Sequence, residues 1–128
     1  MAVPAGASAE RTFQVGPEDT AAALGSGDLD VLGTPRLVAW CEAVTVAAVA
    51  SYLEPSQTTV GSRVEIEHVR AVPVGAEVTV RAQVADVDGR LLRLEVAAGE
   101  DGGPVGNGSV TRAVVDRDRF LARLRRPA

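Results

Sequence analysis

The 128-residue chain contains one cysteine, Cys41, and one histidine, His68, so it has few of the residues that build disulfides and zinc sites. A single cysteine excludes an intrachain disulfide, and nothing marks the chain as secreted. One cysteine and one histidine are too few ligands for a zinc site. The short stretch "GNG" is not a phosphate-binding loop. We therefore expect neither a metal nor another cofactor.

Net positive charge is also lacking, because the formal net charge at pH 7 is −4. A nucleic-acid partner usually requires a basic patch, so we expect none. Basic residues do cluster in "DRDRFLARLRR", but acidic residues alternate with them. This pattern indicates the solvated face of a terminal helix.

A secretory leader and a long apolar run are missing as well. The first residues, "MAVPAGASAE", have no basic segment followed by a long apolar one, so they do not resemble a signal peptide. Glu42 and Thr45 interrupt the longest apolar stretch, which makes it a poor membrane span. We expect a soluble, cytoplasmic protein without a membrane partner.

The residues that are present fit one globular domain, since 46% are hydrophobic and the length allows a real core. We expect residues 1–10 to be a flexible arm and residues 11–128 to form a single domain. "RTFQV" suggests a first strand, and a short helical turn could start near Asp19. The long-helix pattern covers residues 36–53, with Thr34 and Pro35 resembling an N-cap and its following proline. Glu54-Pro55 ends this helix.

After the helix, the hydrophobic period changes from 3.6 to 2, which predicts strands. The stretches that alternate are "TTVGSRVEIEHVRAV", "EVTVRAQVADV", "LLRLEVAA" and "VGNGSVTRAVV". "VDGR" is an Asp-Gly hairpin signal between the second and third strands, and "DGGP" turns the chain again. The sequence therefore predicts an α+β domain in which one long helix precedes an antiparallel meander.

Glu42 is unexpected because it falls within the apolar side of the predicted helix. With Arg36 at zero and about 100° per residue, Glu42 lies at about 240°, between Val49 and Leu53. A carboxylate there is costly unless it is paired or hydrogen-bonded. It could be a structural glutamate tied to an amide or an arginine, a residue near enough to the edge to reach water, or a group for acid–base catalysis.

His68 is expected to point inward, because alternation places it on the same strand face as Val64 and Ile66. A lone histidine on an apolar face can be a hydrogen-bonded core residue or a catalytic group. Since one helix face and one sheet face share a single core, Glu42 and His68 should lie in the same layer.

These features resemble the hotdog-fold acyl-CoA thioesterases, and within them the fluoroacetyl-CoA thioesterase branch. The similarity runs from about Phe13 to Leu124. The stretches that carry it are "VAWCEAVTVAAVASYLEP", "TTVGSRVEIEHVRAVPVGAEVTV" and "GSVTRAVVDRDRF". A hotdog domain is an antiparallel sheet wrapped around one long central helix, which agrees with the predicted plan.

The resemblance also implies site residues. That branch carries a threonine, a glutamate eight residues later and a histidine 26 residues after the glutamate, and Thr34, Glu42 and His68 match both intervals. It also implies substrate contacts for Gly61, at the start of the histidine strand, and for Arg112, in the last strand.

The chemistry of these residues leaves alternatives open. Gly61 could allow close approach of a ligand and donate its N–H to a thioester carbonyl, or it could mark a bulge. Arg112 could contact a CoA phosphate, although from the residues alone we favour a surface position. Thr34 and Glu42 should contact different parts of a substrate, because eight helical residues span about 12 Å.

The resemblance implies hydrolysis of a small acyl-CoA, with Glu42 as base or nucleophile and His68 as the proton donor or the orienting group. Thr34 would position the acyl end or act as nucleophile. A non-catalytic hotdog protein that binds acyl groups or only dimerises is the alternative, and a hydratase on the same fold is a further one. Since hotdog domains usually pair, we expect a homodimer with the site at or near the interface.

The stretch "ALGSGDLDVLG", residues 23–33, corresponds to the segment in which the fluoroacetyl-specific enzyme has phenylalanines that close over the acyl group. Here it has no aromatic residue. A glycine-rich loop is expected to be mobile and wet. We therefore predict a general short-chain acyl-CoA thioesterase without a strong preference for the fluorinated acyl group.

Overall fold

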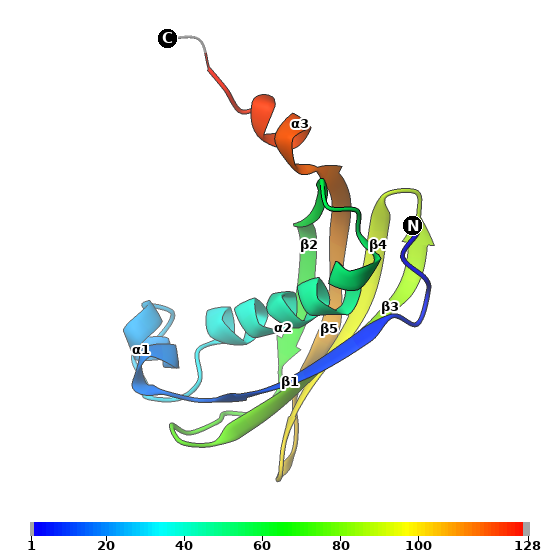
Figure 1. The fold of residues 1–128 in the computed structure, drawn as a ribbon. Helices are drawn as coiled ribbons and strands as arrows, with labels where there is room; N and C mark the ends of the chain where they lie inside the picture. Colours follow the sequence, from blue (N-terminus) through cyan, green and yellow to red (C-terminus); the bar gives the residue numbers. More distant parts are fainter. Residues whose placement is uncertain (1, 127–128) are drawn as a thin grey trace.

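A curved five-stranded antiparallel sheet wraps around one long helix in the computed structural model, which describes residues 2–126 (Figure 1). The strand order in the sheet is β1-β3-β4-β5-β2. The strands are β1 (Ser8–Gln14), β2 (Gln57–His68), β3 (Glu77–Asp88), β4 (Leu91–Glu100) and β5 (Gly103–Asp116). The helices are α1 (Ala21–Leu24), α2 (Thr34–Val49) and α3 (Arg117–Ala122), with 3-10 turns η1 (Pro17–Asp19) and η2 (Ala50–Tyr52). The expected α+β hotdog plan is confirmed, but only β3, β4 and β5 form the expected meander, because β2 pairs with β5 rather than with β3.

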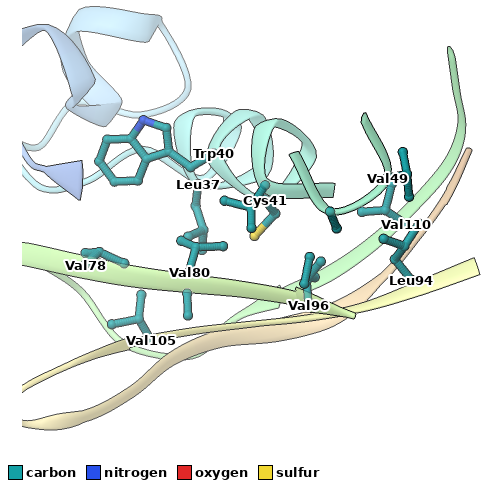
Figure 2. Close-up of a cluster of buried hydrophobic side chains, with 14 of the residues drawn as sticks. Leu37, Trp40, Cys41, Val49, Val78, Val80, Leu94, Val96, Val105 and Val110 are labelled. Atoms are coloured by element: carbon teal, nitrogen blue, oxygen red, sulfur yellow. The ribbon is translucent and has the colours of Figure 1, made fainter. Parts of the chain in front are cut away.

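The core lies between the inner face of the sheet and α2, and Figure 2 shows the side chains that meet there. Strict alternation along β3 and β4 produces this face, because every second residue points to the same side of a strand. The buried residues of these two strands are the ones that the alternation predicts: Val78, Val80, Ala82 and Val84, and Leu92, Leu94 and Val96.

The buried face of α2 is rotated from the one that the sequence predicts. Trp40, Thr45 and Ala48 are buried, whereas Val46 is 43% exposed. The ring of Trp40 stacks on the ring of Phe13 in β1, with ring centroids 4.7 Å apart. β1 therefore covers a side of the helix that the sequence periodicity did not predict to be buried. Glu42 consequently lies at the margin of the buried face rather than inside it.

β2 is an edge strand of the sheet, and within the described chain only β5 pairs with it. Its inner face is incompletely covered, since Val64 is 39% exposed while Ile66 and His68 are half-buried. The expected strand face is therefore correct in direction, but its residues are not all buried. A β-bulge lies between Gly61 and Arg63, where the pairing with β5 shifts by one residue.

The N-terminal residues are packed on the sheet, which corrects the expected flexible arm over residues 1–10. Val3 and Ala7 are buried. Two backbone hydrogen bonds of 2.8 Å, Gly6 N to Val84 O and Val84 N to Ala7 O, continue the sheet beyond β1. Met1 lies outside the described residues.

At the other end of the chain, α3 projects from the end of β5, and its residues are mostly exposed (Figure 1). This confirms the solvated terminal helix. Of the helices in residues 2–126, none is long and apolar enough to cross a membrane.

Candidate functional site

Thr34 and His68 form a direct hydrogen-bonded pair, with 2.7 Å between Thr34 Oγ1 and His68 Nδ1. We expected Thr34 to be the N-cap of α2, but Gly33 occupies that position. The threonine hydroxyl is therefore not used to cap the helix. It reaches His68, the last residue of β2. The other ring nitrogen of His68, Nε2, is buried and has no hydrogen-bond partner among the described residues. This nitrogen is therefore an unsatisfied polar atom of the described chain, and a substrate atom reaches it only when the side chains around it shift.

The pair borders a cavity of ≈ 310 Å³ at the N-terminal end of α2. The walls come from α1, from Ser26, Val31 and Leu32, and from residues 69–71 that follow β2. Part of the glycine-rich stretch 23–33 thus lines the space beside Thr34 and His68. The cavity is large enough for a short acyl group.

Glu42 forms a second group with Arg112 on β5. Their closest atoms, Glu42 Oε2 and Arg112 Nη1, are 3.5 Å apart, and the side chains are 36% and 8% exposed. Two of the open alternatives are observed together, because Glu42 lies beside an arginine and also at the edge of the buried face. Its carboxylate faces a positive charge on one side and solvent on the other.

Arg112 is 7% exposed, so the surface position favoured from the sequence is wrong. The residue that anchors it is Thr59, which sequence reasoning missed. Arg112 Nε donates to Thr59 Oγ1 at 2.8 Å and Nη2 donates to Thr59 O at 3.2 Å, leaving Nη1 directed at Glu42. Burial lowers the pKa of Arg112 and the nearby Glu42 opposes this shift, but a guanidinium remains charged at physiological pH.

Gly61 lies against the Glu42 carboxylate. A Cβ at this position would be 2.7 Å from Glu42 Oε2, closer than real Cβ contacts allow, so any side chain here would displace the carboxylate. The bulge beside Gly61 also has a consequence for His68. Gly61 and His68 are seven positions apart, an odd number, so strict alternation would place them on opposite faces of β2. The extra residue of the bulge brings both onto the face toward α2.

The structure does not join these two groups within one chain. Among residues 2–126, no hydrogen bond or ion pair links the Thr34–His68 pair to the Glu42–Arg112 pair. Gly61, which touches Glu42, is about 23 Å from His68 along an extended strand. The sequence intervals predicted Thr34, Glu42 and His68 as site residues but did not predict this separation.

Cys41 lies next to Glu42 on α2 but points into the core, where it is 2% exposed. Burial, with a smaller contribution from the Glu42 charge, raises the pKa of the Cys41 thiol to about 11. A thiol with such a pKa carries almost no thiolate at neutral pH and is a poor nucleophile. In the described part of the chain, no three His, Cys, Asp or Glu residues group closely enough to hold a metal ion.

Comparison with known proteins agrees with this geometry. Residues 15–118 match the family described as "FlK: Fluoroacetyl-CoA-specific thioesterase". The fluoroacetyl-CoA thioesterase of Streptantibioticus cattleyicolor is 35% identical over 96 residues, which are 75% of this chain and 69% of that protein.

Solved structures show the same fold. The structure described as the basis of activity and substrate specificity of the fluoroacetyl-CoA thioesterase FlK superposes with a TM-score of 0.89 at 30% identity, covering 99% of this chain and 100% of that chain. A hot-dog-like protein of Thermanaerovibrio acidaminovorans has a TM-score of 0.87 at 24% identity over 94% of this chain and 90% of that one. With a matching fold, a family match over most of the chain and a relative at this identity, the chain belongs to the fluoroacetyl-CoA-specific thioesterase family of hotdog enzymes.

Proposed function

We propose that this enzyme hydrolyses small acyl-CoA thioesters to the free acid and CoA, using Thr34, Glu42 and His68. The observation that carries the proposal is the 2.7 Å contact between Thr34 Oγ1 and His68 Nδ1 beside the cavity. If the threonine hydroxyl donates to Nδ1, the proton of a neutral imidazole must reside on Nε2. That N–H has no partner in the described chain, so it can donate a hydrogen bond to a leaving group once the substrate displaces the side chains that bury it.

In this proposal, each group has a separate task. The Glu42 carboxylate either takes a proton from the attacking water or attacks the thioester carbon itself. As the carbon–sulfur bond breaks, the Nε2–H of His68 donates a hydrogen bond to the departing CoA thiolate, and the proton released by the attacking water protonates that sulfur. Thr34 keeps His68 in the tautomer that can donate this hydrogen bond, and Arg112 holds the carboxylate in place. Gly61 leaves room for the thioester, and its N–H is the candidate donor to the developing oxyanion.

We propose that the site is completed by a second copy of the chain. The Glu42 group and the Thr34–His68 group lie at opposite ends of β2, whose outer edge has no partner among residues 2–126. If β2 pairs antiparallel with the same strand of another copy, centred near Glu65, His68 of each copy lies opposite Gly61 of the other. The homodimer would then bring together the two groups that one chain keeps apart.

The acyl specificity that we propose is broad. The stretch 23–33 beside the cavity has no aromatic ring to enclose the acyl group, and Leu29 within it is 65% exposed. An apolar pocket distinguishes acyl groups that differ by one small substituent by only about 1–3 kcal/mol. A cytoplasmic location remains a prediction from the sequence.

The direct test is to incubate the purified protein with acetyl-, propionyl-, butyryl- and fluoroacetyl-CoA and to follow release of CoA with a thiol reagent. Cys41 will give little background, because its thiol is buried with a pKa raised to about 11. We expect turnover of the short acyl-CoAs. Binding of these compounds without CoA release would instead favour the acyl-binding alternative, and hydration of an enoyl-CoA would favour the hydratase.

A further inference from the structure

Three arginines surround a small hollow at the end of the molecule where β5 passes into α3. Arg90 comes from the β3–β4 turn, and Arg119 and Arg123 come from α3 and the turn after it. The hollow has a volume of ≈ 120 Å³, and Phe120 and Val114 contribute its apolar wall. Figure 1 shows α3 at the end of β5, remote from α1.

None of the three guanidinium groups has a carboxylate within ion-pair distance among residues 2–126. Six other arginines, by contrast, form ion pairs in the same structure. Asp116 also lines the hollow, but its Oδ1 accepts the backbone N–H of Arg119 at 3.0 Å as the cap of α3. The hollow is therefore lined by three arginines and one carboxylate, which is an excess of positive charge in a protein whose net charge is −4.

The chemistry of the hollow selects a class of ligand. Guanidinium groups bind phosphate oxygens through paired, charge-assisted hydrogen bonds. A half-buried phenylalanine offers a face on which a nucleobase can stack, and such stacking is worth about 1–3 kcal/mol per base. Three unpaired arginines around one aromatic ring therefore fit a phosphorylated nucleotide better than a carboxylate or an apolar group.

The hollow also lies within reach of the proposed thioester position. Arg112, which holds Glu42, and Asp116, which borders the hollow, are four residues apart on β5, or about 13 Å. The pantetheine arm of CoA, which separates the thioester from the diphosphate, spans a distance of this order.

We propose that Arg90, Arg119, Arg123 and Phe120 bind the phosphorylated adenosine end of CoA. This inference rests on the proposed hydrolysis of acyl-CoA for the identity of the nucleotide. The arginines hold the phosphates, and Phe120 stacks on the adenine. The site thereby anchors the substrate by a part that does not react, at the opposite end of the pantetheine arm from the scissile bond.

Binding of adenosine 3′,5′-bisphosphate to the full-length protein tests the proposal without requiring turnover. Isothermal titration calorimetry should detect binding of the bisphosphate. Orthophosphate should bind more weakly, because it has no base to stack on Phe120. Arg119→Ala should weaken bisphosphate binding about tenfold, as loss of one charge-assisted hydrogen-bonding group does. The bisphosphate affinity of Arg119→Lys should lie between those of wild type and Arg119→Ala. Phe120→Leu should weaken binding of the bisphosphate but not binding of orthophosphate. Arg11→Ala is the matched control, since Arg11 on β1 is an exposed arginine that forms no ion pair within residues 2–126.

Kinetics separate this proposal from the proposed function. Arg119→Ala should raise KM for acetyl-CoA about tenfold while changing kcat little, and it should leave hydrolysis of acetyl-pantetheine, which lacks the nucleotide, unchanged. Equal binding of the bisphosphate to wild type, Arg119→Ala and Arg11→Ala would overturn the nucleotide site even if acetyl-CoA is hydrolysed. Binding of orthophosphate as tight as that of the bisphosphate would overturn the assignment of Phe120 and the nucleotide. Bisphosphate binding that depends on Arg119, in a protein without hydrolase activity, would support the site and contradict the proposed function.

Discussion

Glu42 combines two properties that a structural carboxylate seldom needs together. Arg112 contacts one side of it, while 36% of its side chain is open to solvent. A partly exposed ion pair of this kind contributes little to stability, on the order of 0–1 kcal/mol. The arrangement therefore fits a group kept charged and accessible better than one buried for packing.

Glu42→Gln should separate these interpretations, because it preserves shape and removes the charge. We expect turnover to fall by on the order of 10²-fold or more. The free energy of unfolding should change by less than about 1 kcal/mol. Steady-state kinetics and urea unfolding measure the two quantities. Wild-type turnover in a folded Glu42→Gln protein would return Glu42 to a structural role.

Thr59 should matter through Arg112 rather than through the substrate. Thr59→Val removes the hydroxyl that accepts from Arg112 Nε and leaves a buried charged donor unpaired, a loss of about 1–3 kcal/mol. We expect lower stability and a lower kcat with KM little changed, because the Glu42 carboxylate loses its fixed partner. Thr59→Ser keeps the hydroxyl and should restore both values. If Thr59→Val lowers stability but leaves kcat at the wild-type value, Arg112 does not position Glu42.

At the scale of elements, the stretch 23–33 decides how the acyl group is enclosed. We expected a mobile loop, but backbone hydrogen bonds close it on itself, from Ala22 N to Leu29 O at 3.1 Å and from Ser26 N to Ala21 O at 3.0 Å. Gly25 caps α1 in the left-handed conformation, which only glycine adopts readily. The stretch is thus a shaped wall without aromatic rings.

Selectivity should follow from this wall. We expect the ratio of kcat/KM for fluoroacetyl-CoA over acetyl-CoA to stay near the ratio for alkaline hydrolysis of the same two thioesters, since fluorine activates the carbonyl chemically. That chemical ratio is the control. A preference exceeding it by more than about 10³, or roughly 4 kcal/mol, would mean that selectivity does not need an aromatic lid.

The strands were the most predictable elements. Because β3 and β4 bury every second residue, the alternation of apolar and polar residues in the sequence shows which residues face the core. Helix α2 was less so: its apolar residues surround most of the helix, and the contact between Phe13 and Trp40 that orients it joins distant parts of the chain. Contacts between distant parts of the chain also explain why the geometry of the site could not be predicted. The intervals between Thr34, Glu42 and His68 could be recognised, but the bulge beside Gly61 and the burial of Arg112 against Thr59 depend on pairing between strands.

At the scale of the whole molecule, β2 is a long edge strand that carries one residue of each half of the proposed site, Gly61 beside Glu42 and His68 beside Thr34. An uncovered edge of this length is a liability unless another strand pairs with it. We therefore expect a homodimer by light scattering at micromolar concentration. A monomer under these conditions would exclude the shared site.

Subunit mixing tests the sharing itself. Thr34→Ala and Glu42→Gln proteins should each be inactive, but co-expression should restore about a quarter of wild-type activity, because half of randomly paired dimers contain one site with neither substitution. If all three residues act from one chain, every site in the mixed dimer keeps one substitution and no activity returns.

The central claim is that the Thr34–His68 pair takes part in catalysing the hydrolysis of an acyl-CoA. The value of kcat/KM of His68→Ala for acetyl-CoA tests this claim most directly. The account predicts a fall of on the order of 10²-fold or more relative to wild type, in a protein that unfolds cooperatively. Glu67→Ala, which truncates the neighbouring exposed residue on the other face of β2, should keep wild-type kinetics. A His68→Ala protein with kcat/KM within about twofold of wild type would contradict the account.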